Sequence, residues 1–176
     1  MLQIQPTRHI DQIQHLGYQT YLPHYPHLWH EGGAEWYLNR CFNESQLATE
    51  LTNPAITYYA IYYQGQEVGL LKLVKYKTPS GELDDKALYL EKIYFSEGYT
   101  GMGLGQQTIQ WVCEQAQQQG VEYIWLMAMD SSHKAIASYQ KAGFVPIATT
   151  RLDDTDFRLM KSEYRGMVVL KRFSNF

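Results

Sequence analysis

Residues 94–105, which read YFSEGYTGMGLG, constrain the fold more than any other part of the sequence. A run rich in β-formers precedes their glycines, and beyond them apolar residues recur at helical spacing until Gly120 ends the pattern. A strand, a glycine-rich turn and a helix therefore follow one another. In such a turn the backbone N–H groups and the helix dipole can together bind a pyrophosphate.

The glycine-rich turn is not specific by itself. It also fits a tight strand-to-helix connection that binds no ligand. The dinucleotide-binding loop requires the spacing G-x-G-x-x-G, whereas Gly101, Gly103 and Gly105 alternate. A Walker loop requires Gly-Lys-Ser or Gly-Lys-Thr, which is absent. The rest of the chain must therefore decide between a ligand site and a plain turn.

The periodicity of apolar residues predicts an α/β fold. Helical spacing begins at Ile10, Ile13 and Leu16, and proline and asparagine residues interrupt later helical runs. We expect helices near residues 10–17, 35–51 with a break at 43–45, 104–116 and 132–142, and strands at 56–63, 67–74, 87–95, 123–129, 145–152 and 166–173. This order predicts a sheet with a parallel or mixed centre and a right-handed crossover.

The composition limits the classes of protein. With 176 residues, 45% of them hydrophobic, the chain is expected to form one domain over residues 1–176. The net charge of -3 provides no basic field for a nucleic acid or an anionic membrane. The chain has two distant cysteines, Cys41 and Cys113, and shows neither a leader nor an apolar run of about 20 residues. These features predict a soluble, cytoplasmic protein.

Two motifs resemble the GNAT superfamily of acyl-CoA-dependent N-acyltransferases. Residues 100–105 are similar to its signature Arg/Gln-x-x-Gly-x-Gly/Ala, and residues 132–144 are similar to its helix Asn-x-x-Ala-x-x-x-Tyr-x-x-x-Gly-Phe. Residues 67–69 and 167–170 also resemble family elements, so the resemblance covers nearly the whole chain beyond the first helix. It implies a single-domain GNAT-type α/β fold with a mixed sheet of about six to seven strands, flanked by helices on both faces.

The same resemblance implies acetyl-CoA as cosubstrate and no metal. Pantetheine is expected along the main chain of Ile93, Tyr94 and Phe95. The other implied coenzyme contacts are Thr100, Gly101, Met102, Gly103, Leu104, Gly105, Gln106, Ser132, Ala135 and Tyr139. Thr100 replaces the usual Arg or Gln, and Ser132 replaces the usual Asn. We therefore expect main-chain N–H groups to hold the pyrophosphate, and a change at Thr100 to weaken binding only modestly.

Acetyl transfer to an amine requires a base, a polarised carbonyl and an acid for the departing thiolate. Glu91 lies in an alternating strand among apolar neighbours, where desolvation would raise its pKa and suit it to be the base. The alternative is a glutamate paired with a lysine on the sheet surface. By resemblance, the hydroxyl of Tyr139 is the acid, whereas a core tyrosine with an incidental hydroxyl is the alternative. The N–H groups around residues 93–95 would polarise the carbonyl.

An aromatic and histidine-rich loop surrounds Pro23 and Pro26. Tyr25 and Trp29 are candidate substrate-binding residues through cation–π contacts, with a buried anchor as the alternative. The run His24, His27, His30 is expected to belong to this loop rather than to a metal site, because Pro26 prevents a regular helix. The acidic residues 84–85 and 153–156 could attract a polycation but more often form solvated turns.

The predicted function is therefore N-acetylation of a primary amine on a small molecule, with the bacterial polyamine branch favoured, or on a peptide. A protein amino group is the alternative acceptor. A non-catalytic acyl-CoA-binding module is the rival class, because Thr100 and Ser132 depart from the family pattern. The sequence does not fix the oligomeric state, and a homodimer is one candidate.

Overall fold

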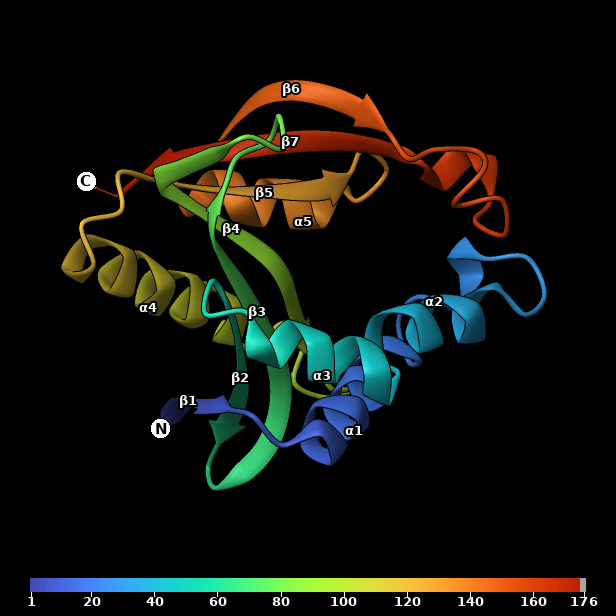
Figure 1. Cartoon of the computed structure of the whole chain (residues 1–176), viewed down its shortest axis with the longest axis horizontal. Coiled ribbons are helices and arrows are strands. Elements are labelled where there is room, and N and C mark those ends of the chain that lie inside the picture. Colours follow the sequence, from blue (N-terminus) through green and yellow to red (C-terminus); the bar gives the residue numbers. More distant parts are fainter. Residues whose placement is uncertain (175–176) are drawn as a thin grey trace. The chain divides into compact units, whose positions relative to one another are not determined.

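The computed structural model describes residues 1–174, which form an α/β fold around a mixed seven-stranded sheet (Figure 1). The strand order is β1-β2-β3-β4-β5-β7-β6. In chain order the elements are β1 (Leu2–Thr7), α1 (Ile10–Tyr21), the 3-10 helix η1 (Pro26–Leu28), α2 (Gly33–Phe42), α3 (Glu44–Thr52), β2 (Ile56–Tyr63), β3 (Gln66–Lys77), β4 (Leu83–Phe95), α4 (Leu104–Gln118), β5 (Tyr123–Met129), α5 (His133–Lys141), β6 (Val145–Arg151), η2 (Ser162–Tyr164) and β7 (Gly166–Phe173).

The sheet is mixed, as the sequence predicts. β4 and β5 run parallel, with Ala87 opposite Tyr123 and Tyr89 opposite Trp125. β5 pairs antiparallel with β7, β7 with β6, and β1 with β2. The parallel pair β4 and β5 is joined through α4, which is the connection that a parallel pair requires.

The chain divides into two compact units. Unit 1 comprises Met1–Leu73 and Lys92–Gly105, and unit 2 comprises Val74–Glu91 and the chain from Gln106 onward. β3, β4 and α4 contribute residues to both units. Each unit has its own buried apolar core.

In unit 1 the helices α1 and α2 pack closely at Gly17. A Cβ atom at Gly17 would lie 2.7 Å from the Phe42 ring, so only glycine leaves room for that ring. Buried aliphatic residues complete this core, namely Ile13, Leu16, Leu38, Leu47, Ile61, Leu70 and Leu71.

A buried ion pair connects α3 to the sheet of unit 1. Nζ of Lys72 lies 2.7 Å from Oε2 of Glu50, and both side chains are nearly inaccessible. The Tyr58 hydroxyl donates to the same oxygen at 2.8 Å, and Nε2 of Gln46 donates to the other oxygen at 2.8 Å. These hydrogen bonds offset the desolvation that makes a buried pair costly.

In unit 2 two aromatic rings stack across the parallel strands. The ring centres of Tyr89 and Trp125 are 3.9 Å apart, with an interplanar angle of 11°. Nε1 of Trp125 donates to the carbonyl of Lys77 at 2.7 Å, which satisfies the polar atom of this buried side chain. The remaining core includes Leu88, Val112, Ile124, Leu126, Phe144 and Leu170.

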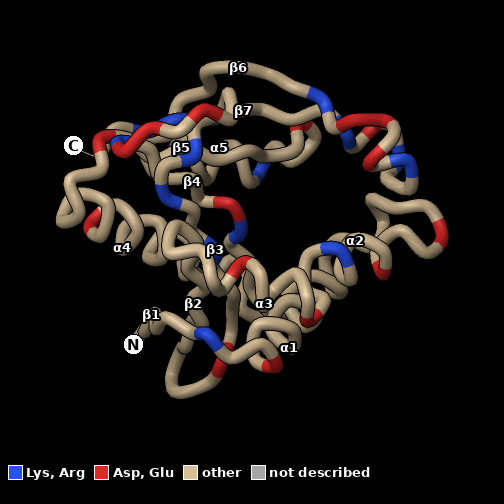
Figure 2. The backbone as a smooth tube through the Cα atoms, viewed as in Figure 1, with Lys and Arg blue, Asp and Glu red and all other residues tan. Residues whose placement is uncertain are grey.

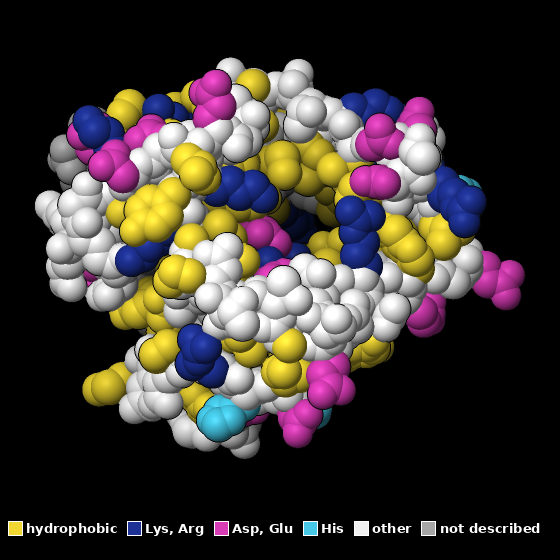
Figure 3. All heavy atoms as spheres, in the orientation of Figure 1, with side chains coloured by type: hydrophobic (Ala, Val, Ile, Leu, Met, Phe, Trp, Pro, Cys, Tyr) yellow, Lys and Arg dark blue, Asp and Glu magenta, His cyan; other side chains and the backbone are white. Residues whose placement is uncertain are grey.

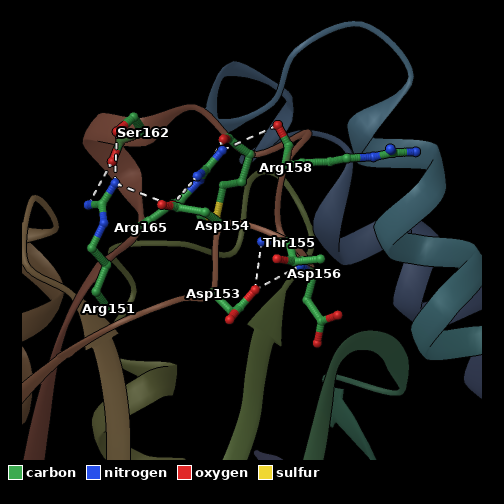
Figure 4. Close-up of polar contacts among 9 residues, drawn as sticks. Arg151, Asp153, Asp154, Thr155, Asp156, Arg158, Ser162 and Arg165 are labelled. Carbon is green, nitrogen blue, oxygen red and sulfur yellow. Dashed lines mark hydrogen bonds and ion pairs between the residues drawn. The ribbon is translucent and has the colours of Figure 1, made fainter.

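The connection between β6 and β7 is held by its own side chains (Figure 4). Arg165 is buried, donates to the carbonyls of Met160 at 2.9 Å and Arg158 at 3.2 Å, and pairs with Asp154. Asp153 accepts hydrogen bonds from the N–H groups of residues 155 and 156. The backbone N–H groups of Asp156 and Thr155 lower the pKa of Asp153. Asp153 and Asp154 are therefore engaged within this turn, which favours the solvated-turn interpretation of the acidic run.

Charges are distributed along the whole chain rather than gathered in one element (Figure 2). On the face drawn in Figure 3, acidic, basic and hydrophobic side chains are interspersed. Within residues 1–174, no helix combines the length and the apolar character that crossing a bilayer requires.

Most predicted elements are confirmed. The break at residues 43–45 separates α2 from α3, and the Asn43 side chain caps α3 by accepting from the N–H of Gln46 at 2.8 Å. Strand β1 was not predicted, because Leu2 and Ile4 alternate with glutamines over only six residues. Ser132 is the N-cap residue of α5, but its side chain makes no capping hydrogen bond.

Candidate functional site

The glycine-rich loop of unit 1 connects β4 to α4. Gly98, Gly101 and Gly103 have φ angles of 87°, 79° and 78°, which side-chain-bearing residues rarely adopt. A Cβ atom at Gly101 or Gly103 would meet no atom within 4 Å, so backbone conformation rather than crowding accounts for these glycines. Among residues 1–174, no backbone carbonyl accepts the N–H of Gly101, Met102 or Gly103. These N–H groups directly precede α4, where they can hold an anion.

Three contacts attach this loop to the β2–β3 hairpin. The N–H of Ser96 donates to the carbonyl of Val68 at 2.8 Å. The Tyr99 hydroxyl donates to Oε1 of Gln66 at 2.6 Å, and its ring makes an edge contact with Tyr63. Oγ of Ser96 is buried and has no hydrogen-bond partner in the described part of the chain. The loop is thus fixed at its β4 end.

The end of β4 lies very close to Gly69 of β3. A Cβ atom at Gly69 would lie 2.7 Å from the carbonyl oxygen of Tyr94 and 3.1 Å from Cδ1 of Phe95. The Phe95 ring also faces the first turn of α4, at 3.8 Å from a Cβ placed on Gly105. Gly69 therefore sets the path of the main chain that the sequence assigns to pantetheine.

Replacing Gly69 with alanine is expected to displace residues 94 and 95. We expect a loss of about 1–3 kcal/mol in the free energy of unfolding, because overpacking a close contact has this cost. Coenzyme A should also bind more weakly, which titration calorimetry measures. The matched control is Gly65→Ala in the same hairpin, where φ is 81° and no atom crowds the new Cβ. That variant should lose stability and keep coenzyme affinity, and equal affinities for both variants would contradict the role of Gly69.

Aromatic side chains from α1, its following loop, α2 and β4 pack together in unit 1. We call Tyr21, Tyr25, Trp29, Tyr37 and Tyr94 the aromatic cluster. Tyr21 lies 4.7 Å from Tyr25, 5.1 Å from Tyr37 and 5.9 Å from Tyr94, measured between ring centres. Burial raises the pKa of all four tyrosines, so their hydroxyls remain neutral hydrogen-bonding groups at physiological pH.

The two predicted substrate residues occupy different positions in the aromatic cluster. Trp29 is 6% exposed, stacks on Tyr37 at 5.2 Å and donates from Nε1 to the Tyr21 hydroxyl at 2.8 Å. These contacts favour the anchor interpretation of Trp29. Tyr25 is only half-buried, and its ring lies 5.7 Å from that of Tyr94. Within the described residues its hydroxyl forms no hydrogen bond, which leaves it available to a ligand.

The histidine run does not form a cluster of metal ligands. His24 places Nε2 at 2.9 Å from the carbonyl oxygen of Phe95 and so connects the loop after α1 to the end of β4. His27 lies in η1, and His30 is exposed. Across residues 1–174, no group of three or more His, Cys, Asp or Glu side chains could hold a metal ion.

Unit 2 contains the remaining predicted site residues. Gln106 of α4 donates from Nε2 to the carbonyl and hydroxyl oxygens of Ser138, both at 2.7 Å. Its amide nitrogen therefore joins α4 to α5, a use that the sequence did not reveal. Ser132 and Ala135 lie half-buried at the start of α5, and α5 buries none of its residues completely.

The two candidate catalytic side chains also belong to unit 2. Glu91 is half-buried in β4, directly after four consecutive buried residues, Ala87–Leu90. This stretch is therefore buried on both faces of the sheet rather than alternating. Tyr139 is half-buried in α5, and its ring makes an edge contact with Phe144 at 6.1 Å. Both side chains are accessible enough to meet a ligand.

The sequence did not reveal the roles of three residues around β4. His24 and Tyr99 hold the strand end and the glycine loop, but each bonds to a residue far away in the chain, so no local pattern marks them. Lys92 is 6% exposed, and its Nζ lies 5.8 Å from the Tyr37 ring centre and 6.0 Å from that of Phe42. For Lys92, the only signal in the sequence was the presence of a lysine within an apolar strand.

Comparison with known proteins agrees with this geometry. The model of the acetyltransferase (GNAT) family matches residues 17–144. An uncharacterised N-acetyltransferase of the pepI 3′ region of Lactobacillus delbrueckii subsp. lactis is 27% identical over 131 residues, covering 72% of this chain and 76% of that protein.

Two solved structures share the fold. The PaiA N-acetyltransferase of Thermoplasma acidophilum, in complex with coenzyme A, superimposes with a TM-score of 0.73 at 13% identity, covering 98% of this chain and 99% of that chain. A variant of the spermidine N-acetyltransferase of Vibrio cholerae has a TM-score of 0.69 at 10% identity, covering 98% and 94%.

Proposed function

Because the chain belongs to the acetyltransferase (GNAT) family and is therefore an acyltransferase, we propose that it transfers an acetyl group from acetyl-CoA to a primary amine. A small amine or polyamine is the favoured acceptor. The observation that carries the coenzyme assignment concerns the N–H groups of Gly101, Met102 and Gly103, which lie directly before α4 and which no backbone carbonyl of residues 1–174 accepts. Such groups suit a pyrophosphate, which acetyl-CoA contains.

In the proposed reaction the amine attacks the thioester carbon directly, in a ternary complex. Glu91 first takes a proton from the bound ammonium, so that a neutral amine attacks, and main-chain N–H groups around residues 93–95 stabilise the oxyanion. The C–N bond forms first, and the C–S bond of the tetrahedral intermediate then breaks as the Tyr139 hydroxyl gives its proton to the departing thiolate. The second proton lost by the nitrogen returns to the Tyr139 oxygen, and the first leaves through Glu91. The products are an acetamide and free coenzyme A. No step requires a metal ion.

The aromatic cluster supports a cationic small acceptor. Tyr25 offers a half-buried ring and an available hydroxyl, which together suit an ammonium group. Trp29 would contribute to acceptor binding indirectly, because its contacts hold Tyr21 and Tyr37 in place. The spermidine-acetylating enzyme that shares the fold agrees with this choice, although a protein amino group remains the alternative acceptor.

Initial rates of thiol release with a panel of acceptors test this proposal. The panel contains monoamines, diamines, polyamines and lysine-containing or free-amino-terminal peptides. We expect amine-dependent thiol release that is fastest with a small amine or polyamine. Faster thiol release with a peptide would mean that the acceptor is a protein amino group instead of a small amine. Coenzyme binding without acetylation of any acceptor would favour the non-catalytic module.

We also propose that residues 1–176 act as one catalytic domain and that it works in the cytoplasm. β3, β4 and α4 each contribute residues to both units, which supports a single functional domain. A homodimer is compatible with this proposal. Sedimentation of the purified protein measures its oligomeric state directly.

A further inference from the structure

The end of β4 fixes the imidazole ring of His24 in one tautomer. Nε2 of His24 lies 2.9 Å from the carbonyl oxygen of Phe95. A carbonyl oxygen can only accept a hydrogen bond, so Nε2 carries the hydrogen. In the neutral ring the other nitrogen, Nδ1, then carries no hydrogen and presents a lone pair. His24 therefore offers a hydrogen-bond acceptor whose position is set by the bond that Nε2 makes.

His24 and Tyr25 both have a polar atom that remains available to a ligand. Within residues 1–174, neither Nδ1 of His24 nor the hydroxyl of Tyr25 has a hydrogen-bond partner. Both side chains are half-buried, and their ring centres lie 6.0 Å apart. The Tyr25 ring also lies 5.7 Å from that of Tyr94 in β4. Two adjacent residues of unit 1 thus bring a lone pair, a hydroxyl group and an aromatic ring together.

The other polar atoms of the aromatic cluster are already engaged. The Tyr21 hydroxyl accepts a hydrogen bond from Nε1 of Trp29 at 2.8 Å. The side chains of Tyr37 and Tyr94 are hydrogen-bonded to each other. In this part of unit 1, the polar side-chain atoms that the described chain leaves without a partner are therefore those of residues 24 and 25.

The simpler explanation is that His24 only anchors the loop after α1 to the end of β4. It accounts for the bond from Nε2 to Phe95. It does not account for the choice of an imidazole, because an amide side chain could donate the same bond. It also leaves unexplained why the half-buried hydroxyl of Tyr25, the next residue, has no partner in the described chain.

We infer that His24 is a further residue of the acceptor site, where its Nδ1 accepts a hydrogen bond from an N–H group of the acceptor amine. The inference rests on the proposed function, which supplies the amine. An ammonium group can donate this bond, and so can the neutral primary amine that remains after deprotonation. No proton moves to His24. The bond holds the nitrogen near the end of β4, and the Tyr25 ring adds a cation–π contact while the nitrogen is charged.

Two matched ligands test the inference, namely butylamine and butyltrimethylammonium. Both have the same alkyl chain and a positive charge, but only butylamine has N–H groups. Each is measured as a competitive inhibitor against the best acceptor of the panel, at a constant concentration of acetyl-CoA. The preference for a ligand with N–H groups reports the bond to Nδ1, whereas the affinity for butyltrimethylammonium reports the remaining contacts.

His24→Gln removes the acceptor and keeps the anchor. The glutamine amide nitrogen can replace Nε2 in the bond to Phe95, and no acceptor then occupies the place of Nδ1. We expect the inhibition constant of butylamine to rise about tenfold, because a hydrogen bond to a charged group has roughly this effect. The inhibition constant of butyltrimethylammonium, the affinity for coenzyme A and the melting temperature should stay unchanged.

Two further variants serve as controls. In His24→Asn the amide oxygen can replace Nδ1, but the side chain is too short to reach the carbonyl of Phe95. This variant should lose thermal stability and retain a preference for butylamine. His30→Gln changes an exposed histidine of the same connection between α1 and α2, and it should alter neither inhibition constant.

The outcomes separate this inference from the proposed function. If His24→Gln left both inhibition constants unchanged, or raised both equally, His24 would be only an anchor and the proposed function would stand. Absence of thiol release with every amine of the panel would instead reject the proposed function.

Nuclear magnetic resonance of ¹⁵N-labelled histidine tests the same bond without turnover and in the unmodified protein. In the complex with coenzyme A, the neutral ring of His24 should carry its hydrogen on Nε2. Butylamine should shift the Nδ1 signal, and butyltrimethylammonium should not. A hydrogen on Nδ1 in the neutral ring, or an Nδ1 signal that butylamine does not shift, would overturn the inference.

Discussion

Tyr139→Phe is expected to lower turnover about 100-fold or more while leaving the affinity for acetyl-CoA within about twofold. The expectation follows from the proton that the departing thiolate needs, since a positioned general acid contributes about 100- to 10,000-fold. The phenylalanine ring keeps the edge contact with Phe144, so α5 should keep its position. Steady-state rates of thiol release and calorimetric binding measure the two quantities separately.

Tyr123→Phe is the matched control for this variant. Tyr123 also lies in unit 2, and its hydroxyl donates to Asp84 at 3.2 Å near the start of β5. Removing that hydroxyl should leave turnover unchanged. If Tyr139→Phe retained full turnover across the pH range, the proton would come from another group. If instead both variants lost turnover equally, a general loss of stability would explain the result.

Glu91→Gln is expected to lower turnover at neutral pH by about 100-fold, because glutamine cannot take the proton that the bound ammonium must lose before it attacks. The defect should shrink as the pH rises, since a growing fraction of the acceptor is then already a neutral amine. Rates measured over a series of pH values with saturating acetyl-CoA give both results. Coenzyme affinity should be unaffected.

Glu122→Gln is the control for the base. Glu122 is half-exposed and forms a surface ion pair with Lys86 at 2.7 Å, so its neutralisation should not change turnover. A Glu91→Gln variant whose loss is the same at every pH would mean that Glu91 positions the acceptor rather than deprotonating it. Unchanged turnover would remove Glu91 from the mechanism.

Local patterns predict much of this fold. The spacing of apolar residues predicts β5 and β7 with the same bounds that the structure shows, and the alternating glycines predict the loop before α4. The positive φ angles of Gly101 and Gly103 explain why glycine is required there. The break before α3 was also predicted, and it is local in origin, because the Asn43 side chain caps α3 through a residue only three positions further on. Features set by local backbone chemistry can thus be read from the sequence.

Contacts between distant segments were not visible in the sequence. The bond from His24 to Phe95 spans 71 residues, and the clearance at Gly69 depends on a neighbouring strand. Gln106 was assigned to the coenzyme by its place in a motif, yet its amide nitrogen bonds to Ser138 of α5. Trp29 could have been a binding residue or an anchor until its partners Tyr21 and Tyr37 were known.

The partners of the acidic residues could not be read from the sequence either. A sequence shows that Asp153 and Asp154 are close together, but not that one accepts backbone N–H groups and the other pairs with Arg165 (Figure 4). Likewise, all of β6 and most of β7 lie between Lys141 and Arg172 in the chain. The two residues line the same pocket only after folding. The role of a charged residue therefore depends on partners that the fold supplies.

The most direct test of acetyl transfer to an amine measures both products of one reaction. Purified protein is mixed with acetyl-CoA and the best acceptor of the panel, and free thiol and acetylated amine are quantified together by absorbance and mass spectrometry. We predict equal amounts of the two, formed only when both substrates are present and at a rate that saturates with each. Thiol release without acetylated amine, or tight binding of coenzyme A with neither product, would contradict acetyl transfer to an amine.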